Sequence, residues 1–329
     1  MSHTILGKKI GPIGYGLMGL TVTGSVAEDK AIAAIKTAID SGCNYLNGGE
    51  FYGPPNANSL ALLRKYFEKY PEDAEKVVLN VKGGMSPNRS PDASKEGIIR
   101  SIDNCLNTLG PVGRIDQFEP ARKDKNVPFE ETLETIDSYV KSGKIGAISV
   151  SELGEETLRK AASQFNITSL EIELSLFRTE PITNGLLAAC AELNIPVLAY
   201  SPLCRGFLGG QLKTPDDLPE NDFRRMLPRY QGENFNKNIE LVNKVEALAK
   251  KKGCTIGQIA INWLLSISKR PGMPVIIPIP GSSNPERIKE NATIIDLSPA
   301  ELAEIDAILE TFVAAGDRYP KMLMGDLDL

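Results

Sequence analysis

Short apolar segments alternate with segments of helical period along almost the whole chain. The apolar segments are mostly uninterrupted by polar residues, which is typical of parallel strands buried on both faces. The segments between them place apolar residues three and four positions apart, the spacing of one helix face. The eight expected strands are residues 13–19, 45–53, 76–82, 115–122, 145–151, 169–176, 196–202 and 275–280.

This alternation favours two architectures. A (β/α)8 barrel and a doubly wound sheet both place a helix after each strand. The count of eight and the lack of a linker near the middle favour the barrel, as a single domain over residues 1–329. Residues 5–11 predict an N-terminal hairpin, and the loop 204–235 predicts extra structure at the C-terminal face. The expected helices are 28–41, 59–70, 94–109, 129–142, 155–164, 182–193, 237–252, 256–268, 285–291 and 299–311.

The residue counts exclude several classes of function. A net charge of −5, without a basic cluster, argues against a nucleic-acid partner. No run reaches the roughly 18 apolar residues of a membrane span, so the expected location is the cytoplasm, with access to the nucleus also open. The single histidine, His3, argues against a Ser-His-Asp triad and a His-ligated metal, and we expect no metal site. Five cysteines without Cys-x-x-Cys spacing are expected to be reduced thiols: Cys43, Cys105, Cys190, Cys204 and Cys254.

The stretch 45–53 carries the first candidate for chemistry. It runs from an apolar strand into a Gly-rich loop that holds Tyr52, and Lys82 ends the next expected strand in the same way. Adjacent buried strands would bring the phenol and the ammonium together. A nearby Lys⁺ lowers the pKa of a tyrosine from its usual value of about 10. Taken separately, a packed aromatic and a strand-end charge explain the two residues as well, but together they predict a proton donor and its support.

Polar and aromatic residues also mark the C-terminal ends of the other expected strands. In a barrel these ends meet at one mouth, where catalytic groups lie. The residues at these positions are Leu17, Met18, Asn47, Ala121, Arg122, Ser151, Glu152, Glu171, Glu173, Tyr200, Ser201, Gly281, Ser282 and Ser283.

The end of the last strand resembles a phosphate site. Gly281, Ser282 and Ser283 precede an expected helix start, whose free amides and hydroxyls suit a phosphate. Arg287, about one turn into that helix, can add a charge-assisted hydrogen bond. The alternative is an ordinary Ser/Asn helix cap. The glycines of residues 11–19 do not match a Gly-x-Gly-x-x-Gly dinucleotide fingerprint.

Taken together, several segments resemble the aldo-keto reductase family over nearly the whole chain. They are GEFYG at 49–53, VKGG at 81–84, VSE at 150–152, AYSPL at 199–203 with Arg205 and Gly206, and IPGSS at 279–283 with Arg287, Glu290 and Asn291. The resemblance implies a (β/α)8 barrel that uses NADPH to reduce the carbonyl of a small-molecule aldehyde.

The resemblance also implies individual roles. Tyr52 falls on the proton-donating tyrosine and Lys82 on the lysine that supports it. Tyr200 falls on the aromatic that stacks against nicotinamide, and Glu171 stands where the family usually has Gln for the carboxamide. Arg287 falls on a 2′-phosphate contact, together with Ser282. The implied cofactor contacts are Leu17, Met18, Ser151, Glu152, Glu171, Tyr200, Ser201, Leu203, Arg205, Gly206, Ser282, Ser283, Arg287, Glu290 and Asn291.

Two positions depart from the family pattern. Asn47 stands where the family usually has Asp, and Ala121 stands where it usually has His. The same replacements resemble the fungal pyridoxal reductase branch, which implies the reduction of pyridoxal to pyridoxine. Asn47 can hydrogen-bond Lys82 but carries no charge. We therefore expect a loosely paired lysine, more of whose charge acts on Tyr52.

The substrate pocket should be aromatic with a few polar groups. Phe51 and the tail residues Arg318 and Tyr319 are its expected walls. Arg122 or Glu50 would meet a ring hydroxyl or nitrogen, and a surface salt bridge is the alternative for Arg122.

Other interpretations stay open at this stage. They are an NADPH-binding regulatory subunit with little turnover, a broad-specificity aldehyde reductase, and a phosphate-handling barrel isomerase. Arg224 and Arg225 in the long loop could close over the cofactor pyrophosphate, or form a solvated basic pair. A monomer or weak oligomer is expected.

Overall fold

Within residues 3–22 and 26–321, the part that the computed structural model describes, eight strands form one parallel sheet in sequence order. The order of the ladder runs from β3 to β10 without a crossover, which is the arrangement of a barrel and not of a doubly wound sheet. The strands are β3 (Tyr15–Gly16), β4 (Tyr45–Gly49), β5 (Val78–Gly83), β6 (Gln117–Pro120), β7 (Ala147–Ser151), β8 (Ile167–Glu173), β9 (Val197–Tyr200) and β10 (Ile276–Pro278).

Two backbone hydrogen bonds join the first and last strands and close the barrel. The amide of Gly14 donates to the Pro278 carbonyl (2.9 Å), and that of Gly16 donates to the Pro280 carbonyl (3.1 Å). The closure needs a glycine, because a Cβ on Gly14 would lie 2.8 Å from the Tyr45 carbonyl oxygen and 2.9 Å from Ile279 Cγ2. The predicted (β/α)8 architecture is therefore confirmed.

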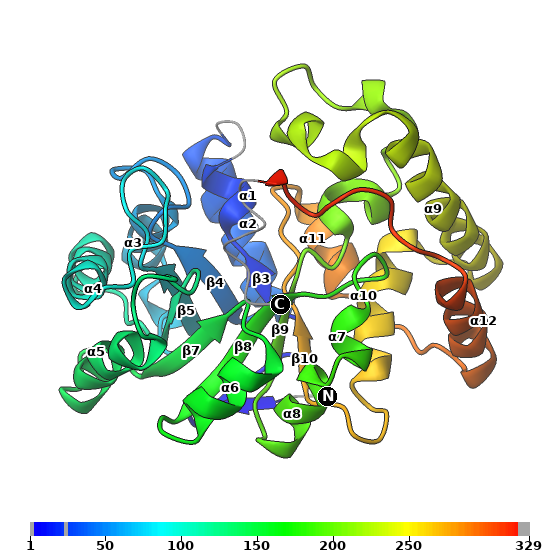
Figure 1. Cartoon of the computed structure of the whole chain (residues 1–329). Helices are drawn as coiled ribbons and strands as arrows, with labels where there is room; N and C mark the ends of the chain where they lie inside the picture. Colours follow the sequence, from blue (N-terminus) through cyan, green and yellow to red (C-terminus); the bar gives the residue numbers. More distant parts are fainter. Residues whose placement is uncertain (1–2, 23–25, 322–329) are drawn as a thin grey trace.

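Helices surround the sheet, as Figure 1 shows. Two expectations about individual elements are wrong. The first strand is short because residues 18–21 turn into a helix, and the helix expected at 182–193 is two helices separated by Gly185, whose φ of 96° breaks the helical path. The helices are α1 (Met18–Thr21), α2 (Glu28–Asp40), α3 (Ser59–Lys69), α4 (Lys95–Leu109), α5 (Phe129–Lys141), α6 (Glu155–Ala162), α7 (Glu180–Thr183), α8 (Leu186–Glu192), α9 (Gly232–Lys252), α10 (Ile256–Ile267), α11 (Pro285–Ala292) and α12 (Pro299–Glu310).

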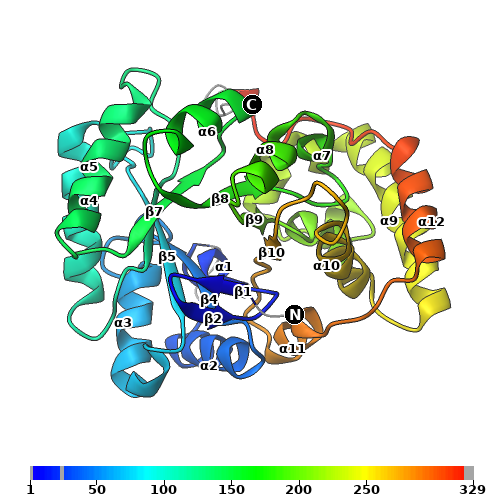
Figure 2. The ribbon, with the colours of Figure 1, turned by 90° about the horizontal axis from the view of Figure 1, so that it is seen from below.

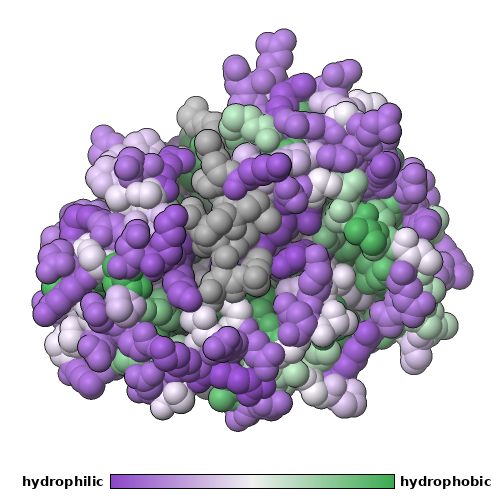
Figure 3. Space-filling model, in the orientation of Figure 1, coloured by the Kyte–Doolittle hydropathy of each residue, from purple (hydrophilic) through white to green (hydrophobic). Residues whose placement is uncertain are grey.

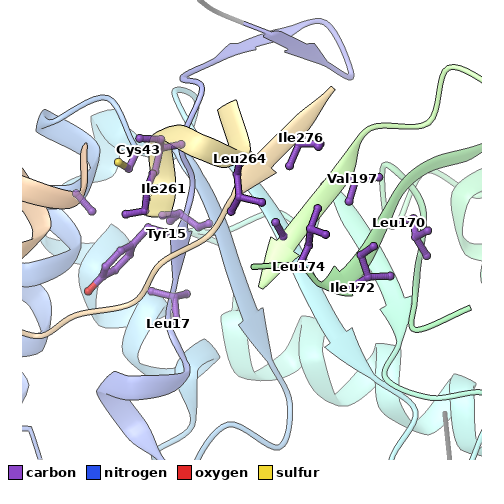
Figure 4. Packing of buried hydrophobic residues seen from close by; sticks show 14 of the residues in the cluster. Tyr15, Leu17, Cys43, Leu170, Ile172, Leu174, Val197, Ile261, Leu264 and Ile276 are labelled. Atoms are coloured by element: carbon purple, nitrogen blue, oxygen red, sulfur yellow. The ribbon is translucent and has the colours of Figure 1, made fainter. Parts of the chain in front are cut away.

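The main hydrophobic core lies between the barrel and these helices. Figure 4 shows Ile261 and Leu264 of α10 packed between Tyr15 of β3 and Ile276 of β10. Burying each such side chain contributes roughly 1.5–3 kcal/mol to the free energy of unfolding. This core therefore fixes the barrel wall from outside.

The predicted N-terminal hairpin is confirmed and closes the lower end of the barrel. Strands β1 (His3–Ile5) and β2 (Lys8–Ile10) pair antiparallel and lie across the barrel when it is viewed from below (Figure 2). Ile5 and Ile10 pack against Val78, Leu198 and Ile277, which begin or line the strands at that end. The interior is thus accessible from the opposite end, where the strands finish.

The long loop after β9 is built from short 3₁₀ turns at Cys204–Gly209, Pro215–Asp217, Phe223–Met226 and Pro228–Tyr230. It stands over the C-terminal face of the barrel, as expected for an inserted functional loop. Hydrophilic residues cover most of the face seen in Figure 3. Within the described ranges, no helix combines the length and the apolar character that a membrane span requires, and all five cysteines are free thiols.

Candidate active site

A cavity of about 810 Å³ opens at the C-terminal ends of the strands. Its wall includes five residues that were expected to take part in catalysis or to bind the substrate. These residues lie on or directly after the neighbouring strands β4, β5 and β6, so the parallel pairing of these strands brings them together at one end of the barrel. They are Asn47, Phe51, Tyr52, Lys82 and Arg122.

The loop that carries Tyr52 is fixed from three sides. Ser59, at the start of α3, exchanges hydrogen bonds with both backbone groups of Gly49 (2.9 and 3.0 Å), and its own amide donates to the Tyr52 carbonyl (2.9 Å). Thr21 donates to the same carbonyl (2.7 Å). The Tyr52 ring lies directly against Gly49, where a Cβ would come within 3.0 Å of Tyr52 Cγ. Gly49 therefore leaves the space that the phenol ring occupies.

Lys82 is held by two buried carboxylates. Its Nζ pairs with Glu119 Oε1 and with Glu171 Oε2 at 2.8 Å. Asn47 donates through Nδ2 to the same oxygen of Glu171 (2.5 Å), so it supports the carboxylate and not the lysine. The expectation of a loosely paired lysine is therefore wrong. Asn47 carries no charge, and the acidic partners of Lys82 come from two other strands, Glu119 from β6 and Glu171 from β8.

Glu119 is the residue of the site that sequence analysis missed. It lies on β6 directly opposite Lys82 on β5 in the parallel register. Ser149 on β7 donates to its second oxygen (3.0 Å), so both carboxylate oxygens have a donor. Neighbouring parallel strands point directly paired residues to the same face, but the pairing of Lys82 with Glu119 is seen only in the structure.

Behind Glu119, a chain of polar groups runs down the barrel interior. Ser149 shares a hydrogen bond with Ser169 (2.7 Å), Gln117 donates to Ser169 (3.0 Å), and Tyr45 donates to Gln117 (2.7 Å). A satisfied buried network of this kind specifies one arrangement of its members. This network therefore fixes Glu119 from the barrel interior, in addition to its ion pair with Lys82.

Burial raises the pKa of Tyr52 above its ordinary value of 10. Lys82 acts in the opposite direction, but Glu171 and Glu119 add to the rise and offset much of the lysine. The expectation that Lys82 produces a net lowering of the Tyr52 pKa is therefore wrong. Tyr52 is consequently a protonated phenol at neutral pH, which is the form that a proton donor needs.

The pKa of Glu171 predicts how the stability of the folded protein changes with pH. Burial, followed by repulsion from Glu119, raises the pKa of Glu171 from 4.5 to about 8. Between these values the folded protein keeps a proton that the unfolded chain has lost. Stability contributed by this group is therefore present below pH ~4.5 and lost as pH rises toward ~8, by up to about 1.4 kcal/mol per pH unit.

The measurement is urea unfolding from about pH 5 to 8 for the unmodified protein and for Glu171→Gln, whose amide cannot titrate. The variant should show a flatter dependence on pH. Glu310→Gln, an exposed change at the end of α12, is the matched control and should keep the original slope. Equal slopes for all three proteins would show that Glu171 does not hold the extra proton.

Most of the expected cofactor contacts lie in the cavity wall. Leu17 does not, because it is fully buried in the core, and Glu290 does not, because its carboxylate accepts from Thr255 Oγ1 (2.8 Å) beside α10. Ser151 and Glu152 lie just below the wall, at the end of β7. The expected contacts that line the cavity are Met18, Glu171, Tyr200, Ser201, Leu203, Arg205, Gly206, Ser282, Ser283, Arg287 and Asn291.

Two observations bear on whether these residues suit a dinucleotide. Ser151 Oγ is buried and has no hydrogen-bond partner among the described residues, although buried hydroxyls are normally paired. Arg287 reaches from α11 to the Gly209 carbonyl (3.1 Å) and lines the far end of the same cavity. An unpaired hydroxyl at the end of β7 and a guanidinium in the cavity wall suit an amide and a phosphate respectively.

The start of α11 also contains the ordinary cap that was considered as the alternative. Asn284 Oδ1 accepts from the amides of Glu286 (2.9 Å) and Arg287 (3.3 Å). These two amides are therefore already paired within the protein. A phosphate at this end would depend on the Ser282 and Ser283 segment and on the Arg287 side chain.

Two expectations about polar residues near the mouth need correction. Glu50 does not face the cavity, because Ser101 (2.5 Å) and Asn104 (2.8 Å) of α4 hold its carboxylate. Arg225 is tied to the Leu218 and Pro219 carbonyls of its own loop. Arg224 does line the cavity, where it pairs with Asp222 and donates to the Arg205 carbonyl (2.8 Å).

The chain matches known proteins along most of its length. The model of the aldo/keto reductase family matches residues 12–310. A protein of Schizosaccharomyces pombe named "Probable pyridoxal reductase 2" is 39% identical, over 98% of this chain and 98% of that protein. The aldo-keto reductase yakc of the same yeast, with NADP(+) in its name, is 34% identical, over 94% of this chain and 91% of that protein.

A solved structure has the same fold. The glycerol dehydrogenase of Gluconobacter oxydans superposes with a TM-score of 0.82, covering 96% of this chain and 97% of its own, at 23% sequence identity. At this identity the likeness concerns the fold alone.

Proposed function

This chain belongs to the aldo/keto reductase family, a family of oxidoreductases of aldehydes and alcohols, and within it we propose that the protein is an NADPH-dependent reductase of pyridoxal. The observation that carries the proposal is the cavity wall in which Tyr52 and Lys82 lie beside Ala121. A proton donor, a supporting cation and a small residue where a flat ring needs space suit the reduction of an aromatic aldehyde. The product would be pyridoxine.

In the proposed mechanism, Tyr52 donates its phenolic proton to the carbonyl oxygen of the aldehyde as the carbon is reduced. A nicotinamide cofactor held by the proposed contacts would supply the hydride. Lys82 favours the phenolate that remains on Tyr52, because an opposite charge stabilises the ionised form. Glu119 and Asn47 act one step further away, by holding Lys82 and Glu171 respectively. Closure of the lower barrel end excludes water from that side of the reacting groups.

The proposed cofactor contacts form two groups, one for each end of the dinucleotide. Tyr200, Ser151 and Glu171 would surround the nicotinamide, and the unpaired Ser151 hydroxyl supports a contact to the carboxamide. Arg287, with Ser282 and Ser283, would bind the adenosine 2′-phosphate. A guanidinium suits a phosphate because it can make charge-assisted hydrogen bonds.

Arg287→Ala tests the choice between NADPH and NADH. The variant should bind NADPH about 10- to 150-fold more weakly, the value of one or two charge-assisted bonds, with little change for NADH, which lacks the 2′-phosphate. The measurement is a fluorescence titration with each nucleotide. Lys289→Ala, exposed on the same helix, is the control. Equal losses for both nucleotides would place the phosphate elsewhere.

The pyridoxal assignment also draws on Arg122. Its guanidinium lines the cavity near Tyr52, donates to the Ala121 carbonyl (2.6 Å), and forms no ion pair within the described residues. A cation in this position suits the ring hydroxyl of pyridoxal, which is readily ionised. The alternative of a surface salt bridge is not supported by these contacts.

The direct test is to mix the purified protein with NADPH and pyridoxal and to follow the absorbance of the reduced nucleotide. A panel of aldehydes of similar size but without a ring hydroxyl serves as the comparison. Pyridoxal should have the highest kcat/KM of the panel. Equal values across the panel would indicate a broad-specificity aldehyde reductase, and tight NADPH binding without turnover on any aldehyde would indicate a regulatory protein.

A further inference from the structure

The segment after α12 returns to the mouth of the barrel, as the red ribbon in Figure 1 shows. Asn238 of α9 holds its first part, accepting from the Ala315 amide (2.8 Å) and donating to the Ala315 carbonyl (2.9 Å). Three residues further on, the chain places Arg318 and then Tyr319 at the mouth. The segment has no regular structure between residues 312 and 320, so side chains must hold it in place.

Arg318 lies in a buried network of four charges. Its Nε donates to Glu173 Oε2 (2.7 Å) and its Nη2 donates to Glu152 Oε1 (2.9 Å). Arg229 of the long loop pairs with the other oxygen of Glu173 (3.3 Å). All four side chains are at most 8% exposed, so the pairs are shielded from solvent and salt. Two carboxylates from two strand ends are thus matched by two guanidinium groups from outside the barrel.

The same guanidinium also contacts the cavity wall. Arg318 Nη2 donates to the Tyr200 hydroxyl (2.7 Å), and that hydroxyl lies 3.1 Å from the Tyr319 hydroxyl. Arg205 Cζ lies 4.7 Å from the centre of the Tyr319 ring. Tyr200, Tyr319 and Arg205 all line the cavity. One arginine therefore connects the aromatic wall to the ends of two barrel strands.

The backbone conformation of Glu152 also indicates that its contacts with Arg318 are fixed. Glu152 has a φ of 54°, in the left-handed region that non-glycine residues seldom adopt. Its amide donates to the Glu171 carbonyl (2.9 Å), and its carboxylate accepts from the Glu173 amide (3.0 Å) as well as from Arg318. A strained backbone persists where its surroundings fix it strongly. This explains why Glu152, expected to face the cofactor, has its carboxylate occupied within the protein.

We propose that Arg318 is a positioning residue that holds Tyr200 and Tyr319 as one wall of the cavity, so that the nicotinamide end of the cofactor binds only when the C-terminal segment is seated. This inference rests on the proposed function, which assigns the nicotinamide contact to Tyr200. It assigns no chemical step to Arg318. The expected signature is weaker cofactor binding together with a loosened segment, and little change in kcat once cofactor is saturating.

Arg318→Met tests the proposal. It keeps most of the side-chain volume and removes every donor, so NADPH should bind about 5- to 150-fold more weakly, the range of a coupling free energy between two parts of a protein. Hydrogen exchange of residues 311–321 should become faster in the variant, and NADPH should slow that exchange in the unmodified protein. Arg318→Lys should be intermediate, because one ammonium cannot reach both carboxylates and the phenol in the same geometry.

Two further variants keep the test decisive. Arg318→Met leaves Glu152 without its cation and can fail to fold, so Arg318→Met combined with Glu152→Gln removes both charges of that pair while Arg229 still matches Glu173. Lys321→Met, exposed on the same segment, should bind NADPH as the unmodified protein does. Unchanged NADPH affinity in a folded Arg318 variant with faster exchange would overturn the proposal, as would unchanged exchange.

The outcome can be separated from that of the proposed function. If the unmodified protein binds no NADPH, the function fails, but the exchange of residues 311–321 still reports whether Arg318 holds the segment. If the unmodified protein binds NADPH and reduces pyridoxal while Arg318→Met does the same with equal affinity, the function stands and the positioning role of Arg318 is rejected.

Discussion

A Tyr52→Phe variant should reduce pyridoxal with a kcat about 10²- to 10⁴-fold below that of the unmodified protein, the contribution of a positioned general acid. The change removes one hydroxyl and leaves the ring that packs against Gly49. NADPH affinity should therefore remain within a few-fold of the original value. Steady-state rates at saturating NADPH and a separate binding titration measure the two quantities.

The matched control is Tyr139→Phe. Tyr139 lies on α5, away from the cavity, and its hydroxyl donates to Asp103 (2.9 Å). This variant loses the same atom and should keep close to full activity. Retention of more than about a tenth of kcat by Tyr52→Phe would mean that another group protonates the product.

A Lys82→Met variant should lose both activity and stability. Within the described residues, Lys82 is the only cation paired with Glu119 and Glu171. Its removal leaves the carboxylate of Glu119 buried without a cation, beside a Glu171 whose raised pKa keeps it largely protonated at neutral pH. An uncompensated buried charge costs roughly 3–5 kcal/mol of the free energy of unfolding. The phenolate of Tyr52 loses its nearest support at the same time, so kcat should fall as well. Urea unfolding and steady-state kinetics separate the two effects.

A triple variant distinguishes charge burial from chemistry. Lys82→Met combined with Glu119→Gln and Glu171→Gln replaces all three ionisable groups with little change of shape. Its stability should recover most of the loss seen in Lys82→Met, because no unpaired charge stays buried. Its activity should not recover. If the triple variant is as unstable as Lys82→Met, the loss does not come from an unpaired buried charge, and the missing hydrogen bonds of the lysine account for it.

The fold could be predicted from sequence because its signals are local. Each strand and helix is encoded in a window of a few residues, and the count of alternating segments gives the barrel. The prediction that Tyr52 and Lys82 share one cavity needed only the rule that parallel strands end on the same face. The errors at α1 and at Gly185 arose where a short helix or a single glycine interrupted an otherwise regular pattern.

Partners of the site residues could not be predicted in the same way. Asn47 suggested an under-supported lysine, since the local sequence gives no sign that Glu119 and Glu171 converge on Lys82 from two other strands. Arg318 lies far along the chain from Glu152, and no periodicity relates the two positions. Contacts of this kind depend on the closed barrel and on side-chain direction, so they become visible only in three dimensions.

The hydrogen bonds that join Gly14 to Pro278 and Gly16 to Pro280 also have a consequence for synthesis of the chain. Strand β3 is the first strand of the barrel to be made, yet one of its edges has no neighbour until β10 has left the ribosome. During most of translation the nascent polypeptide therefore carries an open strand edge that can pair with other chains. We expect chaperones to bind the nascent chain until its last strand is released. Truncation before residue 278 should yield aggregates.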